Sequence, residues 1–325
     1  QARANIPILE AARTDWQRCA NPSWEVFTLV QLAEALAATG DQKKALTTIQ
    51  AAIAIQQNLN EPKDLAINLT TLGILQSNRG DHKAAIAAME DSMRLRRTLD
   101  DVPGQAVGLH NLAAMHERAG DRSRARDLYM QSLAIRRALQ DRAGEADTMA
   151  NLATFHTAQG EYQLGLEYGV ASLRIRSELG DKERQAASNT TVGRAYAFLG
   201  DYRQAEIYFT RALEFYEQLG NPGTLAMILT DLGSLREKVA RDISVAIPLY
   251  ERALDLRKQT GVPRLVALAQ FALCDGLVQA RQYEKARAAG NDGIATGRKV
   301  GFTPAVGNCL YCLGRVSFGE GKLDQ

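Results

Sequence analysis

Apolar residues along this chain recur with the period of an α-helix, and turn-forming residues recur with a second, longer period. In the segment ALTTIQAAIAIQQNL the apolar side chains lie three and four residues apart, which places them on one helical face. A glycine followed by an acidic residue returns every forty residues, at Gly40, Gly80, Gly120, Gly160 and Gly200. Five turns at equal spacing predict an internal repeat.

Other positions keep the same frame. A small residue follows each of these glycines by five positions, at Ala45, Ala85, Ala125, Gly165 and Ala205. A second small residue follows by twelve positions, at Ala52, Ser92, Ser132, Ser172 and Ala212. An aliphatic residue and a small residue precede each turn, from Leu32-Ala33 to Leu313-Gly314. The frame lengthens by one residue after Gly233, which puts the later turns at Arg241-Asp242, Arg281-Gln282 and Gly321-Lys322.

Each unit is predicted to contain two antiparallel helices. The glycine lets the first helix end in a left-handed conformation, and the acidic residue after it can cap the second helix. Prolines are tolerated in the first turn of a helix, and they follow the second helix of a unit at Pro22, Pro62, Pro103, Pro222, Pro263 and Pro304. Because one helix pair cannot bury its apolar face alone, neighbouring pairs are expected to stack into an elongated all-α solenoid.

This pattern resembles the tetratricopeptide repeat. Its forty-residue spacing is similar to the longer-helix variant of kinesin light chains, Leu-Gly-Asn-repeat regulators and many bacterial signalling proteins. The resemblance implies a right-handed α-solenoid of stacked antiparallel helix pairs, a superhelix that forms one domain over residues 1–325. Most first helices lack the Trp that is usual in the family. The expected units are the second helix of a preceding repeat at 1–22, repeats at 23–61, 62–101, 102–141, 142–181, 182–221, 222–261 and 262–302, and a truncated final repeat at 303–325.

Both ends of the chain are expected to lie inside the repeat pattern. Residues 3–19 fit a second helix, and GEGKLDQ stops where another second helix would begin. Repeat arrays normally end in a polar capping unit. We therefore expect this chain to belong to a longer protein, and its uncapped ends allow self-association.

Composition narrows the function classes. The chain has 325 residues, of which 46% are hydrophobic, and its 39 basic and 37 acidic residues give a net charge of +2. This balance gives no reason to expect nucleic acid or an anionic membrane as a partner, and no apolar run reaches the length of a membrane span. Four cysteines are too few for a disulfide scaffold, which favours reduced thiols and a cytoplasmic location.

The family resemblance places candidate binding residues on the concave surface formed by the first helices. The residue before the recurring aliphatic position, and the residue two after it, are expected to point into this groove, as Gln31 and Glu34 do in the first repeat. Amides can pair with an extended peptide backbone, and a guanidinium can hold a carboxylate. The alternative is that these side chains bond to neighbouring helices or face water. The candidates are Thr71, Asn111, Asn151, Thr154, Thr191, Arg194 and Asp231.

Two further features have both structural and functional interpretations. Arg96, Arg136, Arg176 and Arg257 stand in register in the second helices and could grip a polyanion, but we favour pairing with acids in the next connection, at Asp100, Asp141 and Asp181. Gly165 and Gly169 replace larger residues of other repeats, which suggests a small pocket or a joint. We favour compensation by Tyr162 and Tyr168 instead.

No motif predicts catalysis, a metal site or a cofactor. Cys309 and Cys312 have a spacing found in metal and redox sites, but a single pair without further ligands is a weak indication, and buried packing is favoured. We therefore expect that this segment is not an enzyme. We expect a protein- or peptide-binding scaffold that forms the recognition module of a larger signalling protein. The alternative is a small-ligand sensor, as in bacterial transcription regulators or CHAT-type proteases.

Overall fold

The computed structural model describes residues 2–240 and 243–321 of the chain. In these residues it contains sixteen α-helices and one 3-10 helix, with no strand. The predicted all-α helical repeat solenoid is therefore confirmed. The helices are α1 Ala2–Arg18, α2 Pro22–Ala38, α3 Gln42–Gln56, α4 Pro62–Arg79, α5 His82–Thr98, α6 Val102–Arg118, α7 Arg122–Ala138, α8 Arg142–Ala158, α9 Tyr162–Glu178, α10 Lys182–Leu199, α11 Tyr202–Leu219, α12 Pro222–Ala240, η1 Ile243–Val245, α13 Ile247–Thr260, α14 Pro263–Gln279, α15 Tyr283–Lys299 and α16 Thr303–Gly319.

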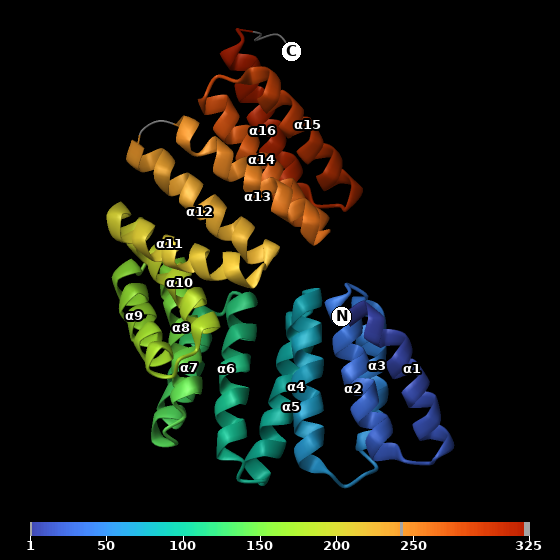
Figure 1. Cartoon of the computed structure of the whole chain (residues 1–325). Helices are drawn as coiled ribbons and strands as arrows, with labels where there is room; N and C mark the ends of the chain where they lie inside the picture. The colour runs from blue at the N-terminus through green and yellow to red at the C-terminus, as the bar shows by residue number, and fades with distance from the viewer. Residues whose placement is uncertain (1, 241–242, 322–325) are drawn as a thin grey trace. The chain divides into compact units, whose positions relative to one another are not determined.

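The chain divides into two compact units, Gln1–Thr148 and Met149–Gln325, and the division falls inside α8. Within each unit, a first helix packs against the second helix that follows it, as α4 does with α5 and α10 with α11 (Figure 1). A second helix also packs against the next first helix, as α5 does with α6 and α11 with α12. The two units are described separately below, and one continuous domain over 1–325 stays a prediction.

The ends of the helices follow the residues that the period singled out. Asp81 caps α5 by accepting a hydrogen bond from the Ala84 amide at 3.2 Å, and Asp41, Asp121 and Asp201 cap their helices in the same way. Gly80 ends α4 with a φ of 91°, a left-handed conformation that glycine adopts without steric cost. Prolines stand in the first turn of α2, α4, α6, α12, α14 and α16. The predicted turn at Arg241-Asp242 lies outside the described residues.

The recurring small residues let the helices of a pair approach closely. Ala45, Ala85, Ala125 and Ala205 are fully buried. At Gly193 in α10, an added Cβ would come 2.8 Å from Cδ1 of Phe209 in α11, so only glycine leaves room for this ring. Leu225, Ile228 and Leu232 of α12 complete the same apolar cluster around Phe209.

The arginines of the second helices are structural. Arg96 is 6% exposed, and it donates hydrogen bonds to Ser92 (3.2 Å) and Thr70 (3.3 Å) and lies 3.7 Å from Asp101. The predicted partner Asp100 is wrong by one residue, because Asp100 takes up the turn with a φ of 49° and Asp101 caps α6.

Two other arginines of this column confirm the structural role. Arg136 lies 3.9 Å from Asp141, and Arg176 donates to the Arg184 carbonyl (2.8 Å) and to Ser188 (3.0 Å). Burial lowers the pKa of Arg96 and Arg136, and the neighbouring aspartates oppose this shift. Buried guanidinium groups cannot grip a polyanion, so that alternative is wrong for these three residues.

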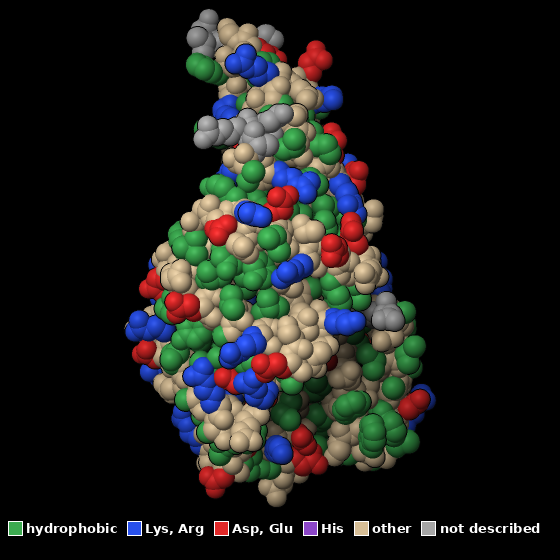
Figure 2. Space-filling model, turned by 60° about the vertical axis from the view of Figure 1, so that its left-hand side comes forward, with side chains coloured by type: hydrophobic (Ala, Val, Ile, Leu, Met, Phe, Trp, Pro, Cys, Tyr) green, Lys and Arg blue, Asp and Glu red, His purple; other side chains and the backbone are tan. Residues whose placement is uncertain are grey.

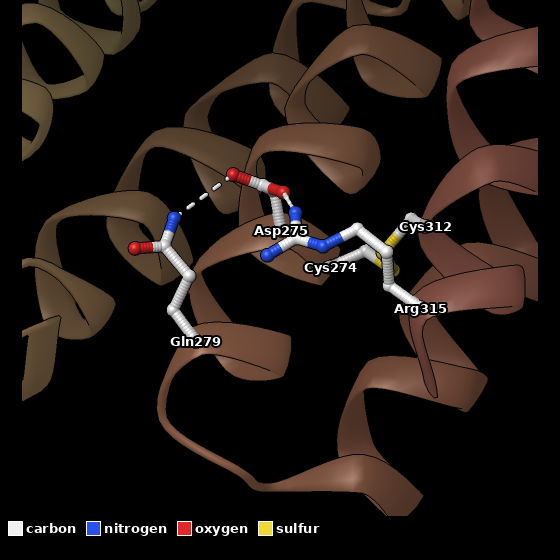
Figure 3. The surroundings of a disulfide bond; sticks show 5 residues. All are labelled: Cys274, Asp275, Gln279, Cys312 and Arg315. Carbon is white, nitrogen blue, oxygen red and sulfur yellow. Dashed lines mark hydrogen bonds and ion pairs between the residues drawn. A yellow bond between two sulfur atoms is a disulfide. The ribbon is translucent and has the colours of Figure 1, made fainter. Parts of the chain in front are cut away.

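A disulfide joins two first helices in the second unit. Cys274 of α14 and Cys312 of α16 form this bond, next to an ion pair between Arg315 and Asp275 (Figure 3). Asp275 also accepts a hydrogen bond from Gln279 at 3.0 Å. The expectation of reduced thiols is therefore wrong for this pair, because the packing of α14 against α16 brings together two cysteines 38 residues apart.

Candidate functional site

The candidate binding residues lie on the first helices and reach solvent. Thr71, Asn111, Asn151, Thr191, Arg194 and Asp231 are half-buried, and Thr154 is exposed. Two pockets open at these positions, one in each unit, and each is lined mainly by neighbouring first helices. We call them the N-terminal pocket and the C-terminal pocket.

The N-terminal pocket lies between α2 and α4 and has a volume of about 410 Å³. Thr71 lines it from α4, and Gln31 and Glu34 line it from α2, so three positions that the resemblance placed in the groove meet here. The end of α3 and the connection to α4 close one side with Gln56 and Glu61. The remaining lining residues are Ser23, Val26, Phe27, Val30, Asp64, Ile67 and Asn68.

Hydrogen bonds hold part of this lining in place. Gln56 is 2% exposed and donates to Glu61 at 2.7 Å. The same carboxylate accepts a 3.4 Å hydrogen bond from the Ser23 hydroxyl. Thr71 donates to the carbonyl of Ile67 in its own helix at 3.4 Å, so its hydroxyl oxygen can still accept a hydrogen bond from a ligand.

The C-terminal pocket has a volume of about 170 Å³ and is lined from α10, α11 and α12. Arg194 and Asp231 meet in its wall, with their Nε–Oδ2 and Nη2–Oδ2 distances at 2.8 and 2.7 Å. Burial raises the pKa of Asp231, and the Arg194 guanidinium opposes this shift. The carboxylate that Arg194 holds in this structure is therefore that of Asp231 in the neighbouring first helix, and binding of a ligand carboxylate by Arg194 stays a prediction. The other lining residues are Ala197, Phe198, Phe209, Ser234, Leu235 and Lys238.

The remaining candidates do not meet in one place. Asn111 belongs to the first unit and Asn151 to the second, so the asparagine ladder between them stays a prediction. Thr154 and Thr191 each donate to a carbonyl of their own helix, at 3.2 Å to Ala150 and 3.4 Å to Ala187. These hydroxyl groups keep acceptor capacity toward solvent.

The space beside Gly165 and Gly169 is filled by neighbouring helices. A Cβ added at Gly165 would collide with the Thr157 hydroxyl and lie 3.0 Å from the Ala153 carbonyl. At Gly169 it would lie 3.0 Å from Cγ2 of Val192. The suggested pocket at these glycines is therefore wrong, and the predicted compensation by Tyr162 and Tyr168 comes instead from α8 and α10.

Sequence reasoning missed several lining residues of the N-terminal pocket. Asp64, Ile67 and Asn68 precede Thr71 by seven, four and three residues, and these spacings belong to one helical face. Extending each candidate along its own helix by this rule would have found them.

The surface and the composition of the sites limit the chemistry further. Basic and acidic side chains are interspersed on the face shown in Figure 2. Among the described residues, no helix has the length and apolar character needed to cross a membrane. In the same part of the chain, no cluster of three or more His, Cys, Asp or Glu residues could hold a metal ion.

Comparison with known proteins identifies the repeat. The sequence profile of the tetratricopeptide repeat matches residues 24–98, 64–138 and 144–218, which together make up more than half of the chain. No curated protein matches the chain significantly.

Solved structures support the same fold. BtubC (BKLC) from P. vanneervenii is 20% identical with a TM-score of 0.59, over 68% of this chain and 92% of that one. The apo quorum sensor NprR from B. thuringiensis is 13% identical with a TM-score of 0.69, over 90% and 83%. The Rap conjugation gene regulator of plasmid pLS20, in complex with the Phr* peptide, is 11% identical with a TM-score of 0.63, over 94% and 77%. From the profile match and these folds, the chain belongs to the tetratricopeptide-repeat family.

Proposed function

We propose that this chain is a peptide- or protein-binding scaffold, the recognition module of a larger signalling protein, and that it binds its partner along the first helices. The observation that carries this proposal is the coincidence of candidate residues with pockets: Thr71 lines the N-terminal pocket, and Arg194 and Asp231 line the C-terminal one. Stacked helices form such pockets before the partner arrives, so little ordering cost falls on the receptor.

The structural neighbours support the same class of function. The Rap regulator of pLS20 was solved with a bound peptide, and NprR is described as a quorum sensor. A binding module of this kind needs no catalytic group, so we propose that the segment itself is not an enzyme. A cytoplasmic location is part of the proposal, although the Cys274–Cys312 disulfide is more typical of an oxidising compartment.

Panning a random peptide-display library on the full chain tests this function. Selected peptides should bind wild-type protein and lose at least about tenfold in affinity when Gln31, Asn68 and Thr71 of the N-terminal pocket are all changed to Ala, because two or three hydrogen bonds are removed. A matched control changes Glu90, Arg97 and Glu251, which are exposed on second helices, to Ala. Recovery of no binding peptide, or equal loss in both variants, would contradict the proposal.

A small-ligand sensor is the second candidate, and the size of the N-terminal pocket favours it. A volume of about 410 Å³ lies within the range of pockets that hold small molecules. Thermal-shift screening against metabolite and nucleotide libraries should then find a compound that raises Tm saturably, and this rise should disappear in an Asn68→Leu variant.

A further inference from the structure

We propose that the N-terminal pocket selects a peptide segment in which a Lys or Arg stands next to a bulky apolar residue. This inference rests on the proposed peptide-binding function and names the chemistry that one of its sites would recognise. Three features of the pocket carry it: acids that form no ion pair, exposed apolar side chains, and an amide side chain that lines the pocket and bonds to no other side chain.

The charges that line the pocket are all negative. Glu34, Glu61 and Asp64 contribute carboxylates, and no Lys, Arg or His is among the lining residues. In the described part of the chain, no ion pair neutralises any of the three; Glu34 and Glu61 accept hydrogen bonds only from neutral Gln31, Gln56 and Ser23. The three acids therefore attract a cationic group into the pocket.

Apolar side chains stand beside these acids and are open to solvent. Phe27 of α2 is 56% exposed and Ile67 of α4 is 48% exposed, and both line the pocket. Val26 and Val30 extend the apolar wall on α2. A bulky apolar side chain of the peptide would cover Phe27 and Ile67 and remove this area from water.

Asn68 supplies the independent sign of a ligand. It is 5% exposed and lines the pocket, yet its amide makes no hydrogen bond to any residue that the structure describes. The amide N and O atoms of Asn68 are not fully enclosed, so they face the water in the pocket and can exchange it for a ligand group that both donates and accepts. A peptide bond of an extended segment provides both groups.

The test pans the same peptide-display library on wild-type chain and on a variant with Glu34→Gln, Glu61→Gln and Asp64→Asn. Peptides selected by wild type should be enriched in Lys or Arg beside Leu, Ile, Phe or Met. Their affinity, measured by fluorescence anisotropy, should fall about tenfold in the variant, since each exposed pair contributes modestly, and should also fall with added salt.

A control variant separates local from overall charge. Glu10→Gln, Glu90→Gln and Glu251→Gln remove the same three charges from exposed positions outside the pocket and should leave the affinity within twofold. If peptides bind but show no basic enrichment, or bind both variants equally, the inference is wrong while the proposed function stands. If no peptide binds wild type, the proposed function fails as well.

Asn68→Leu adds a readout that a purely structural role would not give. The variant should bind the selected peptides several-fold more weakly, and its Tm should be equal to or higher than that of wild type because the substitution breaks no hydrogen bond and buries an apolar side chain. A lower Tm together with unchanged affinity would overturn the role of Asn68 in binding.

Discussion

At the scale of single residues, buried arginines of the second helices hold neighbouring helices together through hydrogen bonds and ion pairs. Arg96, Arg136 and Arg176 are each 6% exposed. They reach the start of the following helix, where their partners are Asp101, Asp141 and the Arg184 carbonyl. Sequence register predicted their structural role, but the partner of Arg96 depended on which of two adjacent aspartates takes up the turn. That choice depends on backbone geometry, which side-chain spacing does not reveal.

Arg96 and its neighbour Arg97 allow a matched comparison on one helix. Arg96→Met removes the hydrogen bonds to Thr70 and Ser92 and leaves Asp101 without its ion pair, so we expect a loss of about 2–4 kcal/mol in the free energy of unfolding. Arg97→Met changes an exposed side chain and should stay within about 0.5 kcal/mol. Urea denaturation measures both, and equal effects would exclude a structural role for Arg96.

His110 makes the first unit sensitive to acid. Its ring lies 3.3 Å from the Thr148 hydroxyl, and burial, reinforced by Arg136 and opposed by Asp147, lowers the pKa of His110 to about 4. In the unfolded chain His110 binds a proton near pH 6.5, whereas in the folded chain it stays neutral until about pH 4. The free energy of unfolding is therefore unaffected by His110 above pH 6.5 and decreases as the pH falls from 6.5 toward 4. The loss amounts to about 3 kcal/mol.

A His110→Gln variant removes this titration. Its free energy of unfolding, followed by urea denaturation from pH 7 to pH 4, should fall less steeply than that of wild type. Identical slopes for the two proteins would show that His110 does not titrate in this window.

At the scale of helices, the forty-residue period predicted most of what the structure contains. Asp caps, prolines in first turns and buried small residues all occupy the expected positions, because these features depend on local sequence. The N-terminal pocket was only partly predicted. The prediction covered two positions beside the recurring aliphatic residue, whereas Phe27 and Ile67 lie elsewhere on the same helical faces. The Cys274–Cys312 disulfide was not predicted, because it depends on how α14 packs against α16.

The recurring small residues differ in how closely neighbouring side chains pack against them. Gly193 and Gly314, which occupy the same place in the repeat, show this difference. Gly193→Ala would force the Phe209 ring away from a contact of 2.8 Å, so we expect a loss of about 1–3 kcal/mol in stability. At Gly314 nothing lies within 4 Å of an added Cβ, and Gly314→Ala should stabilise α16 by up to about 1 kcal/mol. Thermal unfolding of both variants checks the opposite signs, and two destabilised variants would contradict the packing.

At the scale of the whole molecule, the Cys274–Cys312 disulfide should make the stability of the second unit depend on reductant. Closing a loop across 38 residues stabilises by about 4 kcal/mol in the chain-entropy account. Reductant should therefore lower the Tm of wild type but not that of a Cys274→Ser/Cys312→Ser variant. Thiol titration of denatured, unreduced protein should find only Cys19 and Cys309, whereas four reactive thiols would show that the bond is absent.

The central claim is that partners bind along the first helices, and hydrogen exchange of the full chain with a library-selected peptide tests it most directly. A ligand that bridges first helices should slow amide exchange there, since it opposes their local opening. We predict that binding slows amide exchange mainly in α2 and α4, around Asn68 and Thr71. The exchange rates of the solvent-exposed residues of α3 and α5 should stay unchanged. Protection confined to the second helices, with α2 and α4 exchanging as in the free protein, would contradict the account.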